Sequence, residues 1–201
     1  ARLISIVLIS FIAFEYLAAP FPTFQIAIPS FYAELAQTRE EFAVLDVPWG
    51  YYPVMEYMLY ASVHHKPIVE GLSARESPST YRFINNNPVI MKIVWPDAAD
   101  IIVEDLSSIG PSVLAHYNIR YVILHNKYVD QAGRQKYLLV LQQIFGKPVY
   151  QDQDLTAFKT PDTSISTFLS FGENWKSPQG RNGRVVRQII GTTATLNAMI
   201  G

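Results

Sequence analysis

The sequence contains no cysteine, and this absence excludes several kinds of chemistry. Without a thiol, the 201-residue chain forms no disulfide, holds no cysteine-ligated iron–sulfur cluster, attaches no haem covalently and has no thiolate nucleophile. The chain also lacks a surplus of either charge, because 16 basic and 17 acidic residues give a formal net charge of −1. Binding along a nucleic acid backbone needs a basic surface, so we expect no nucleic acid partner.

Charged residues of both signs are scarce. They make up 16% of the chain, against about 25% in an average soluble protein. Hydrophobic residues make up 49%. A surface with so few charges is typical of a chain that contacts a membrane or other subunits, and we expect protein partners for this one.

Residues 3–14, "LISIVLISFIAF", form an uncharged run near the start of the chain. As a helix this run rises about 18 Å, short of the ~30 Å hydrocarbon core of a bilayer. Three interpretations remain open: the end of a membrane-spanning helix, a buried core segment, or the apolar part of a signal peptide. Tyr16 at an interfacial position and a helix-ending Pro20 favour the first. We therefore expect 1–19 to end a membrane helix, with 3–17 contacting lipid or other membrane helices.

Between residues 20 and 162, apolar runs typical of strands alternate with segments of helical periodicity. This order predicts an α/β domain, a three-layer Rossmann-like arrangement with a mainly parallel sheet and a terminal hairpin, entered by a proline-rich linker. Residues 42–47 and 121–124, the latter within the strand expected at 119–126, are nearly continuous apolar runs, so we expect parallel strands of one sheet. The other expected elements are a short strand at 66–71, a hairpin at 147–160, and helices at 52–65, 76–87 and 130–146.

The helix expected at 52–65 follows the first strand directly. Its residues Val54, Met55, Met58, Leu59 and Val63 recur near helical spacing. This spacing predicts a helix.

The residue composition and the pattern of apolar residues change after residue 162. Segments rich in Thr and Ser alternate with apolar residues, and glycines separate them. This pattern predicts that 163–201 is a β-rich segment, the start of a β-sandwich. About forty residues are too few to close such a sandwich, so we expect these strands to be continued by further chain or by a partner.

Two common site motifs are missing from the predicted strand–helix junctions. A dinucleotide-binding Gly-x-Gly-x-x-Gly does not follow the first strand, where Gly50 stands alone between Trp49 and Tyr51. The sequence also has no Gly-x-Ser-x-Gly. We therefore expect no nucleotide cofactor and no serine hydrolase site.

Histidine and aspartate residues are the best candidates for a polar site. Asp46 and His125 lie near the carboxyl ends of predicted strands, where open α/β sheets bind ligands. His64 and His65 end the helix between these strands and are within reach of the same edge. Their spacing matches no metal signature, so we expect no metal. The favoured interpretation is structural: Asp46 would terminate a strand by accepting hydrogen bonds from backbone amides, and His125 would be a polar strand exit.

Aromatic residues are dense just after the first strand. Trp49, Tyr51 and Tyr52 would suit a contact surface on which a sugar ring stacks. Packing against a protein or a membrane surface is the favoured interpretation, because aromatic residues dominate such interfaces. Both interpretations place them at a contact surface.

A series of short segments in the chain resembles the C-terminal extramembrane region of large polytopic bacterial membrane proteins. Those proteins are similar to membrane-embedded glycosyltransferases that use lipid-phosphosugar donors, the GT-C type. The likeness extends over most of the chain, in order and spacing. The segments are "FEYL", "FYAELAQ", "FAVLDVPWG", "VHHKPIVEGLSAR", "NIRYVILHNKY", "FGKPVYQDQDLTAFKT" and "FLSFGENW".

This resemblance implies an extracytoplasmic domain without catalytic residues of its own, because in such transferases the catalytic acids lie near the first membrane helices. Its expected role is to help position a substrate or an acceptor. The alternative is a structural, membrane-anchored subunit of a larger membrane complex, for example an energy-transducing one. A soluble hydrolase would need a nucleophile constellation that the sequence does not show.

Overall fold

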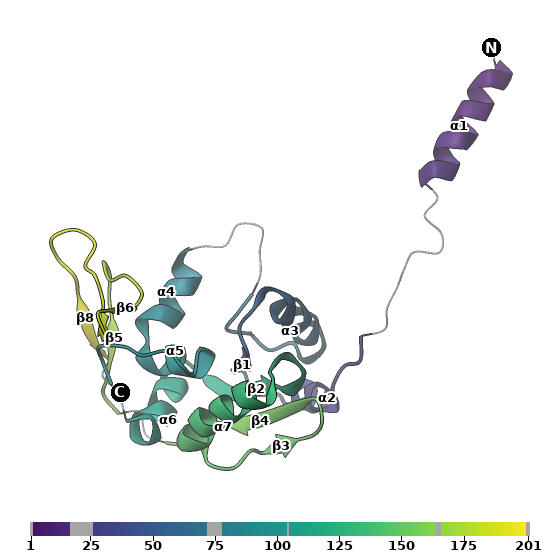
Figure 1. Ribbon diagram of the computed structural model, residues 1–201. Helices are drawn as coiled ribbons and strands as arrows, with labels where there is room; N and C mark the ends of the chain where they lie inside the picture. The colour runs from purple at the N-terminus through teal and green to yellow at the C-terminus, as the bar shows by residue number, and fades with distance from the viewer. Residues whose placement is uncertain (1, 17–25, 72–77, 104, 164–165, 200–201) are drawn as a thin grey trace.

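The computed structural model describes residues 2–16, 26–71, 78–103, 105–163 and 166–199 (Figure 1). At its centre lies a four-stranded sheet with the strand order β1-β2-β4-β3. All four strands are short, and β1, β2 and β4 are almost entirely buried. The strands are β1 (Ala43–Val47), β2 (Ile119–His125), β3 (Tyr150–Gln151) and β4 (Leu155–Lys159).

The sheet is mixed rather than mainly parallel. The predicted parallel pairing of the two apolar strands is confirmed, with Val44 opposite Tyr121 and Val47 opposite Leu124. The pairings β2–β4 and β4–β3 are antiparallel. The reason is local: Asp152 accepts hydrogen bonds from the amides of Asp154 and Leu155 and reverses the chain in a tight turn, so β4 needs no crossover helix. The α/β class is therefore confirmed, with one parallel pair and a terminal hairpin.

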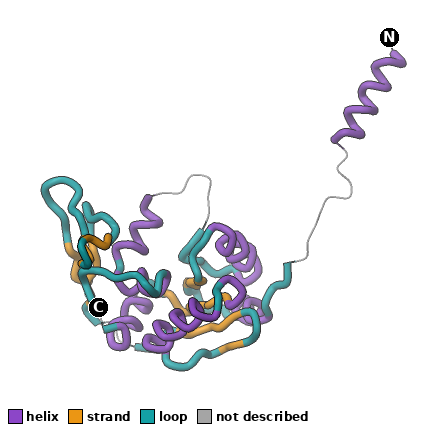
Figure 2. The backbone as a smooth tube through the Cα atoms, viewed as in Figure 1, coloured by secondary structure: helices purple, strands orange, loops and turns teal. Residues whose placement is uncertain are grey.

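Helices cover both faces of the sheet (Figure 2). The pleat sends Leu45 and Val122 to one face, where they pack with residues of α5 (Pro88–Val94), α6 (Leu106–His116) and α7 (Gln131–Phe145). It sends Val44 and Ile123 to the other face, where they pack with α2 (Ser30–Gln37) and α3 (Tyr51–His64). Asp46 and His125 share the alternation of Val44 and Ile123. Their side chains therefore lie on the α2–α3 face.

The helix expected at 76–87 is followed by a second helix after a short break. Within the described residues, α4 (Pro78–Asn86) ends at the asparagines, and α5 begins at Pro88. The side chain of Asn87 accepts hydrogen bonds from the amides of Val89 and Ile90, which caps α5. The cap turns the chain and buries α5 against the sheet.

The predicted helix at 52–65 is present as α3, but only part of its apolar spacing faces the core. Met55 is 52% exposed and Met58 is 42% exposed. The buried residues of α3 are instead Val54, Tyr57, Tyr60 and His64. The reason is that the hydroxyl groups of the two tyrosines find acceptors, Pro48 O and Glu56 Oε2, so the larger aromatic face can be buried without leaving polar atoms unpaired.

The strand expected at 66–71 is reduced to a single parallel bridge between Ile68 and Val44. The bridge is held by hydrogen bonds from Val44 N to Pro67 O and from Val69 N to Val44 O. This short contact still places the backbone after Ile68 alongside β1. Glu70 thereby comes level with Asp46 on the same face of the sheet.

The described residues after 165 form two small antiparallel sheets. One pairs β5 (Phe168–Phe171) with β8 (Leu196–Met199), and the other pairs β6 (Gln179–Arg181) with β7 (Arg184–Val186). The buried guanidinium of Arg187 fastens this segment to the α/β domain by an ion pair with Asp100 and a hydrogen bond to Asn85 O, and it stacks on Phe171 within the segment. That these strands begin a β-sandwich stays a prediction.

The N-terminal helix α1 (Arg2–Tyr16) extends away from the rest of the chain in Figure 1. Every residue from 3 to 16 is exposed. Within the described residues, no helix combines the length and the apolar character needed to cross a bilayer. The expected contact of residues 3–17 with lipid therefore stays a prediction, and residue 17 lies outside the described residues.

Candidate functional site

A hydrogen-bonded group of three buried side chains lies at the carboxyl end of the parallel strands. Asp46 in β1 and His125 at the end of β2 meet with Nε2 of His125 2.8 Å from Oδ1 of Asp46. Tyr32 in α2 reaches the same carboxylate oxygen, with its hydroxyl 2.5 Å from Oδ1. Because an ionised carboxylate only accepts hydrogen bonds, Tyr32 and the Nε2–H of His125 both act as donors.

Aromatic rings enclose this group on the α2–α3 side. The ring of Tyr32 stacks on Tyr60 at 4.6 Å and on His64 at 5.4 Å between centroids. The ring of His125 lies 4.4 Å from that of Tyr57. The polar group therefore lies inside a stack of aromatic residues from α2 and α3. Such a wall excludes water and strengthens the electrostatic interactions inside it.

Glu70 adds a second buried carboxyl group beside Asp46. Burial raises the pKa of Glu70 well above its ordinary value of 4.5, and the negative charge of Asp46 raises it further. The backbone amides of Glu70 and Asp46 act in the opposite direction, although neither forms a hydrogen bond of good geometry with the carboxyl group. The neutral acid is therefore the favoured form of Glu70.

Several buried polar atoms of this cluster lack a hydrogen-bond partner among the described residues. They are Oδ2 of Asp46, both carboxyl oxygens of Glu70 and Nε2 of His64. Nδ1 of His64 accepts the Lys66 amide, so the neutral ring carries its proton on the unpartnered Nε2. Unpaired buried groups of this kind are rare in proteins and concentrate at functional or strained places. Burial also lowers the pKa of His64, which favours this neutral form.

A small pocket of about 260 Å³ adjoins the cluster, and we call it the His125 pocket. Two of its three Asp, Glu and Lys residues, Glu56 and Lys127, form an ion pair, and Glu56 also accepts the hydroxyl hydrogen of Tyr60; the third is Asp154. The pocket lies just below the ~300–1,000 Å³ typical of small-molecule sites, so it suits only a small group. Its lining residues are Ile26, Ala27, Pro29, Glu56, Tyr60, His125, Lys127 and Asp154.

The electrostatics of the cluster favour binding over proton transfer at the tyrosines. Burial raises the pKa of Tyr32 well above its ordinary value of 10.0, and the Asp46 charge adds to the shift. Burial also raises the pKa of Tyr57 and Tyr60. All three hydroxyls are therefore neutral donors at physiological pH. His125 already uses Nε2 toward Asp46, so proton exchange with a molecule in the His125 pocket would need its Nδ1 atom.

The structure brings together three of the four predicted polar candidates. Asp46 and His125 are directly hydrogen-bonded, and His64 stacks on their shared partner Tyr32. His65 is not part of the cluster, because it is the exposed residue that ends α3, in the left-handed conformation with φ of 56°. The interpretation of Asp46 as a turn residue that binds backbone amides is wrong, since its carboxylate bonds side chains instead.

The predicted aromatic surface divides into two parts. Trp49 is half-buried and packs near Trp95 and Tyr81. Tyr51 and Tyr52 are exposed at the start of α3, with their rings edge to face. Only the two tyrosines are therefore free to contact another molecule.

Sequence reasoning missed Tyr32 and Glu70 and the roles of Tyr57 and Tyr60. One signal was present: Tyr57, Tyr60 and His64 recur at three- and four-residue spacing on one helix face. Glu70 gave no such signal, because its position beside Asp46 depends on the single bridge at Ile68.

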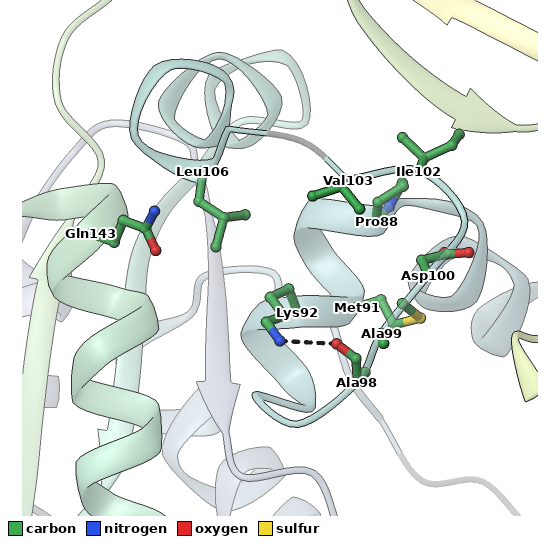
Figure 3. A pocket seen from close by; sticks show the side chains of 10 residues that line it. All are labelled: Pro88, Met91, Lys92, Ala98, Ala99, Asp100, Ile102, Val103, Leu106 and Gln143. Atoms are coloured by element: carbon green, nitrogen blue, oxygen red, sulfur yellow. Dashed lines mark hydrogen bonds between the residues drawn. The ribbon is translucent and has the colours of Figure 1, made fainter. Parts of the chain in front are cut away.

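A second pocket of about 370 Å³ lies on the opposite side of the sheet, next to α5 (Figure 3). Its charged side chains are already engaged: Lys92 Nζ donates to Ala98 O at 2.9 Å, and Asp100 pairs with Arg187. It is therefore a weaker candidate for polar chemistry than the His125 pocket. Its lining residues are Pro88, Met91, Lys92, Ala98, Ala99, Asp100, Ile102, Val103, Leu106 and Gln143.

Comparison with known proteins identifies no related site. No protein-family model, no curated protein and no solved structure matches the chain. Among the described residues, no group of three or more acidic or histidine side chains is placed to hold a metal ion. The site is thus a buried polar cluster next to a small pocket, with no assigned ligand.

Proposed function

We propose that this chain is a non-catalytic, extracytoplasmic domain of a membrane-anchored, glycosyltransferase-like protein, and that it helps to position a substrate or acceptor. In this proposal the α/β domain is a three-layer Rossmann-like unit that carries the binding pocket. Helix α1 holds the domain at the membrane. The sequence resemblance described above is what suggests the class of protein.

The observation that carries the proposal is the apolar surface of α1. Ten large hydrophobic side chains between Leu3 and Tyr16 are 53–82% exposed. Burying a side chain of this size is worth about 1.5–3 kcal/mol, so leaving ten in water is costly. The helix contains one charged residue after Arg2, Glu15 near its end. A lipid bilayer or other membrane helices would cover such a surface.

The His125 pocket supports a positioning role. Its charged lining residues are Glu56 and Lys127, which form an ion pair, and Asp154, whose carboxylate disfavours an anionic ligand. Neutral hydroxyl groups, such as those of a sugar, suit a lining of this kind because they both donate and accept hydrogen bonds. Its residues Ile26, Ala27 and Pro29 belong to the segment that leads from α1. A ligand held near the membrane would therefore reach it.

A non-catalytic role is supported by the arrangement of the polar groups. The residues that line the His125 pocket include no Ser, Thr or Cys nucleophile. His125 is held by Asp46 and Tyr32 through Nε2, in an orientation that a stable core also requires. The cluster thus has a structural explanation as well as a binding one.

Vesicle flotation of the full chain tests the membrane part of this proposal. We expect the wild-type chain to float with phosphatidylcholine vesicles and Ile9→Arg to remain in the aqueous fraction, because a charge in the apolar core costs about 2.5–3.5 kcal/mol. Leu139→Arg, which changes an exposed residue of α7, is the matched control and should float. A wild-type chain that stays in the aqueous fraction would overturn the proposal.

The second candidate function is a structural subunit of a larger membrane complex. It is favoured by exposed apolar residues of the β-rich segment, namely Leu169, Ile189, Ile190 and Leu196. Purification from the native membrane with mass spectrometry separates the two. A constant set of partner subunits in fixed ratio supports this candidate, whereas a chain of glycosyltransferase-like length recovered alone supports the first.

A further inference from the structure

A polar pocket of about 460 Å³ lies between α4 and the small sheet formed by β5 and β8, which stands beside α4 in Figure 1. It shares no lining residue with the His125 pocket. Arg82, Phe83 and Asn86 line it from α4. Ser170 and Asn197, which are opposite one another in the β5–β8 pair, line it from the strands. Its volume falls within the ~300–1,000 Å³ typical of small-molecule sites.

Hydrogen bonds hold the two walls of this pocket in place. The side-chain amide of Asn86 donates to Gly172 O at 2.9 Å, which joins α4 to the residue after β5. Gly172 N donates to Thr195 O, and Glu173 N donates to Thr195 Oγ1. Glycine is required at position 172, because a Cβ atom there would overlap Thr195 Oγ1. The pocket is therefore formed by specific contacts before any ligand binds.

One buried hydrogen-bond donor among the residues that line the pocket lacks an acceptor. Asn87 is 1% exposed, and its Oδ1 atom already accepts from the amides of Val89 and Ile90 at the start of α5. Its Nδ2 atom has no hydrogen-bond partner among the described residues. Buried donors without an acceptor are unfavourable and rare in proteins. An oxygen atom of a bound molecule would satisfy this one, and we call the site the Asn87 pocket.

The other lining groups define the chemistry of such a molecule. Side-chain amides and hydroxyls from both walls can donate as well as accept hydrogen bonds. Phe83 and Tyr117 contribute aromatic rings, which pack edge to face with their centroids 4.8 Å apart. The charged lining residues, Arg82 and Glu173, have opposite signs, so the pocket has no surplus of either charge. This combination suits a neutral ring that carries several hydroxyl groups and has one apolar face.

We propose that the Asn87 pocket binds a neutral saccharide ring, with a hydroxyl oxygen accepting from Asn87 Nδ2 and the apolar face of the sugar against the aromatic wall. An anionic ligand would meet the carboxylate of Glu173, and a cationic ligand would meet the guanidinium of Arg82. A purely apolar ligand would leave Asn87 Nδ2 unpaired. This site goes beyond the proposed function, because it lies apart from the His125 pocket and needs no contact with a membrane.

Nuclear magnetic resonance titration of the full chain tests this inference, in dodecylphosphocholine micelles, whose headgroup carries no sugar. The probes are the methyl glycosides of glucose, galactose and mannose, which differ in the orientation of single ring hydroxyls. We expect at least one of them to shift the backbone amide signals of α4 and β8 in a saturable manner. Cyclohexanol, which lacks the set of hydroxyls, and glucuronate, which adds a negative charge, should bind about tenfold more weakly.

Two variants and a matched control locate the binding site. Asn87→Asp removes the Nδ2 donor but keeps an oxygen that caps α5, and Asn197→Ala removes an exposed amide of β8. Each should weaken sugar binding about tenfold. Gln179→Ala removes an exposed amide of the same β-rich segment outside the pocket and should leave binding unchanged. Because Asn197 is exposed, its variant still tests the inference if Asn87→Asp does not fold.

Failure of all three sugars to bind would overturn the inference, and so would equal binding of cyclohexanol. Tighter binding of glucuronate would show that the pocket selects anions, which overturns the assignment to a neutral sugar. Sugar binding that is unchanged in the folded variants would place the ligand elsewhere. A chain that binds a sugar in this pocket but does not float with vesicles would overturn only the proposed function.

Discussion

Nε2 of His125 lies 2.8 Å from Oδ1 of Asp46, although the two residues are 79 positions apart in the chain. Both side chains are fully buried. The contact exists because β1 and β2 are parallel neighbours in the sheet. The two side chains point to the same face of the sheet and lie side by side at its carboxyl end. Tyr32 then closes the group from α2. The stability of the α/β domain should depend on this contact.

Asp46→Asn should lower the free energy of unfolding by about 1–3 kcal/mol, because a neutral amide accepts weaker hydrogen bonds and its amino group faces the donors Tyr32 and His125 or remains unpaired. Urea denaturation at pH 7 measures the change. Asp154→Asn, at an exposed hairpin position, is the control and should stay within about 0.5 kcal/mol. Equal stability of Asp46→Asn and the wild type would show that the contact contributes nothing.

Glu70→Gln should stabilise the protein at neutral pH but not at pH 4. The folded-state pKa of Glu70 is raised above its ordinary value of 4.5, so above that pH the unfolded chain releases a proton that the folded chain still holds. Stability contributed by Glu70 therefore falls as pH rises from about 4.5 toward the folded pKa. Glutamine does not titrate and avoids this loss.

Urea denaturation of Glu70→Gln and the wild type at pH 4, 6 and 8 gives the measurement. The difference in unfolding free energy should grow with pH. Glu173→Gln, which changes an exposed residue, should show no such growth. A difference that is constant across pH would mean that Glu70 is ionised in the folded protein.

Val122→Asp should unfold the α/β domain. Val122 is fully buried between α5–α7 and the sheet, and an unpaired charge there costs roughly 3–5 kcal/mol. Loss of the near-ultraviolet circular dichroism signal would report this. Val149→Asp, at a residue that is 55% exposed, should leave the signal unchanged. Native-like dichroism of Val122→Asp at ambient temperature would contradict the assigned strand.

Arg187→Met should release the β-rich segment without unfolding the α/β domain. Arg187 pairs with Asp100 and also donates to Asn85 O and Lys176 O, so its removal leaves Asp100 buried and unpaired. Hydrogen exchange followed by mass spectrometry should show faster exchange in β5 and β8 and unchanged exchange in β2. The exposed Arg181→Met is the control.

A double variant makes the Arg187 prediction sharper. Adding Asp100→Asn removes the unpaired charge, so Arg187→Met with Asp100→Asn should be less destabilised than the sum of the two single variants. Strict additivity would show that the ion pair does not couple the two parts.

The sequence determined the order and type of the main elements, because these depend on local patterns. Continuous apolar runs identified β1 and β2, and the turn at Asp152 with the apolar residues beside it identified the hairpin. The helix periodicity identified α3 and α7. The uncharged run of α1 was likewise readable from the sequence, but its exposure was not, because a buried core segment fits the same run.

Only the tertiary structure decided which face of α3 is buried and what Asp46 contacts. Both depend on non-local packing. The aromatic face of α3 is preferred because Pro48 O and Glu56 satisfy its hydroxyls. Asp46 meets His125 and Glu70 through two separate strand contacts, and it meets Tyr32 through the packing of α2. A period of 3.6 or 2 residues defines the faces of an element but cannot state which neighbour covers each one. The candidate site is therefore defined by tertiary contacts and not by the spacing of its residues in the sequence.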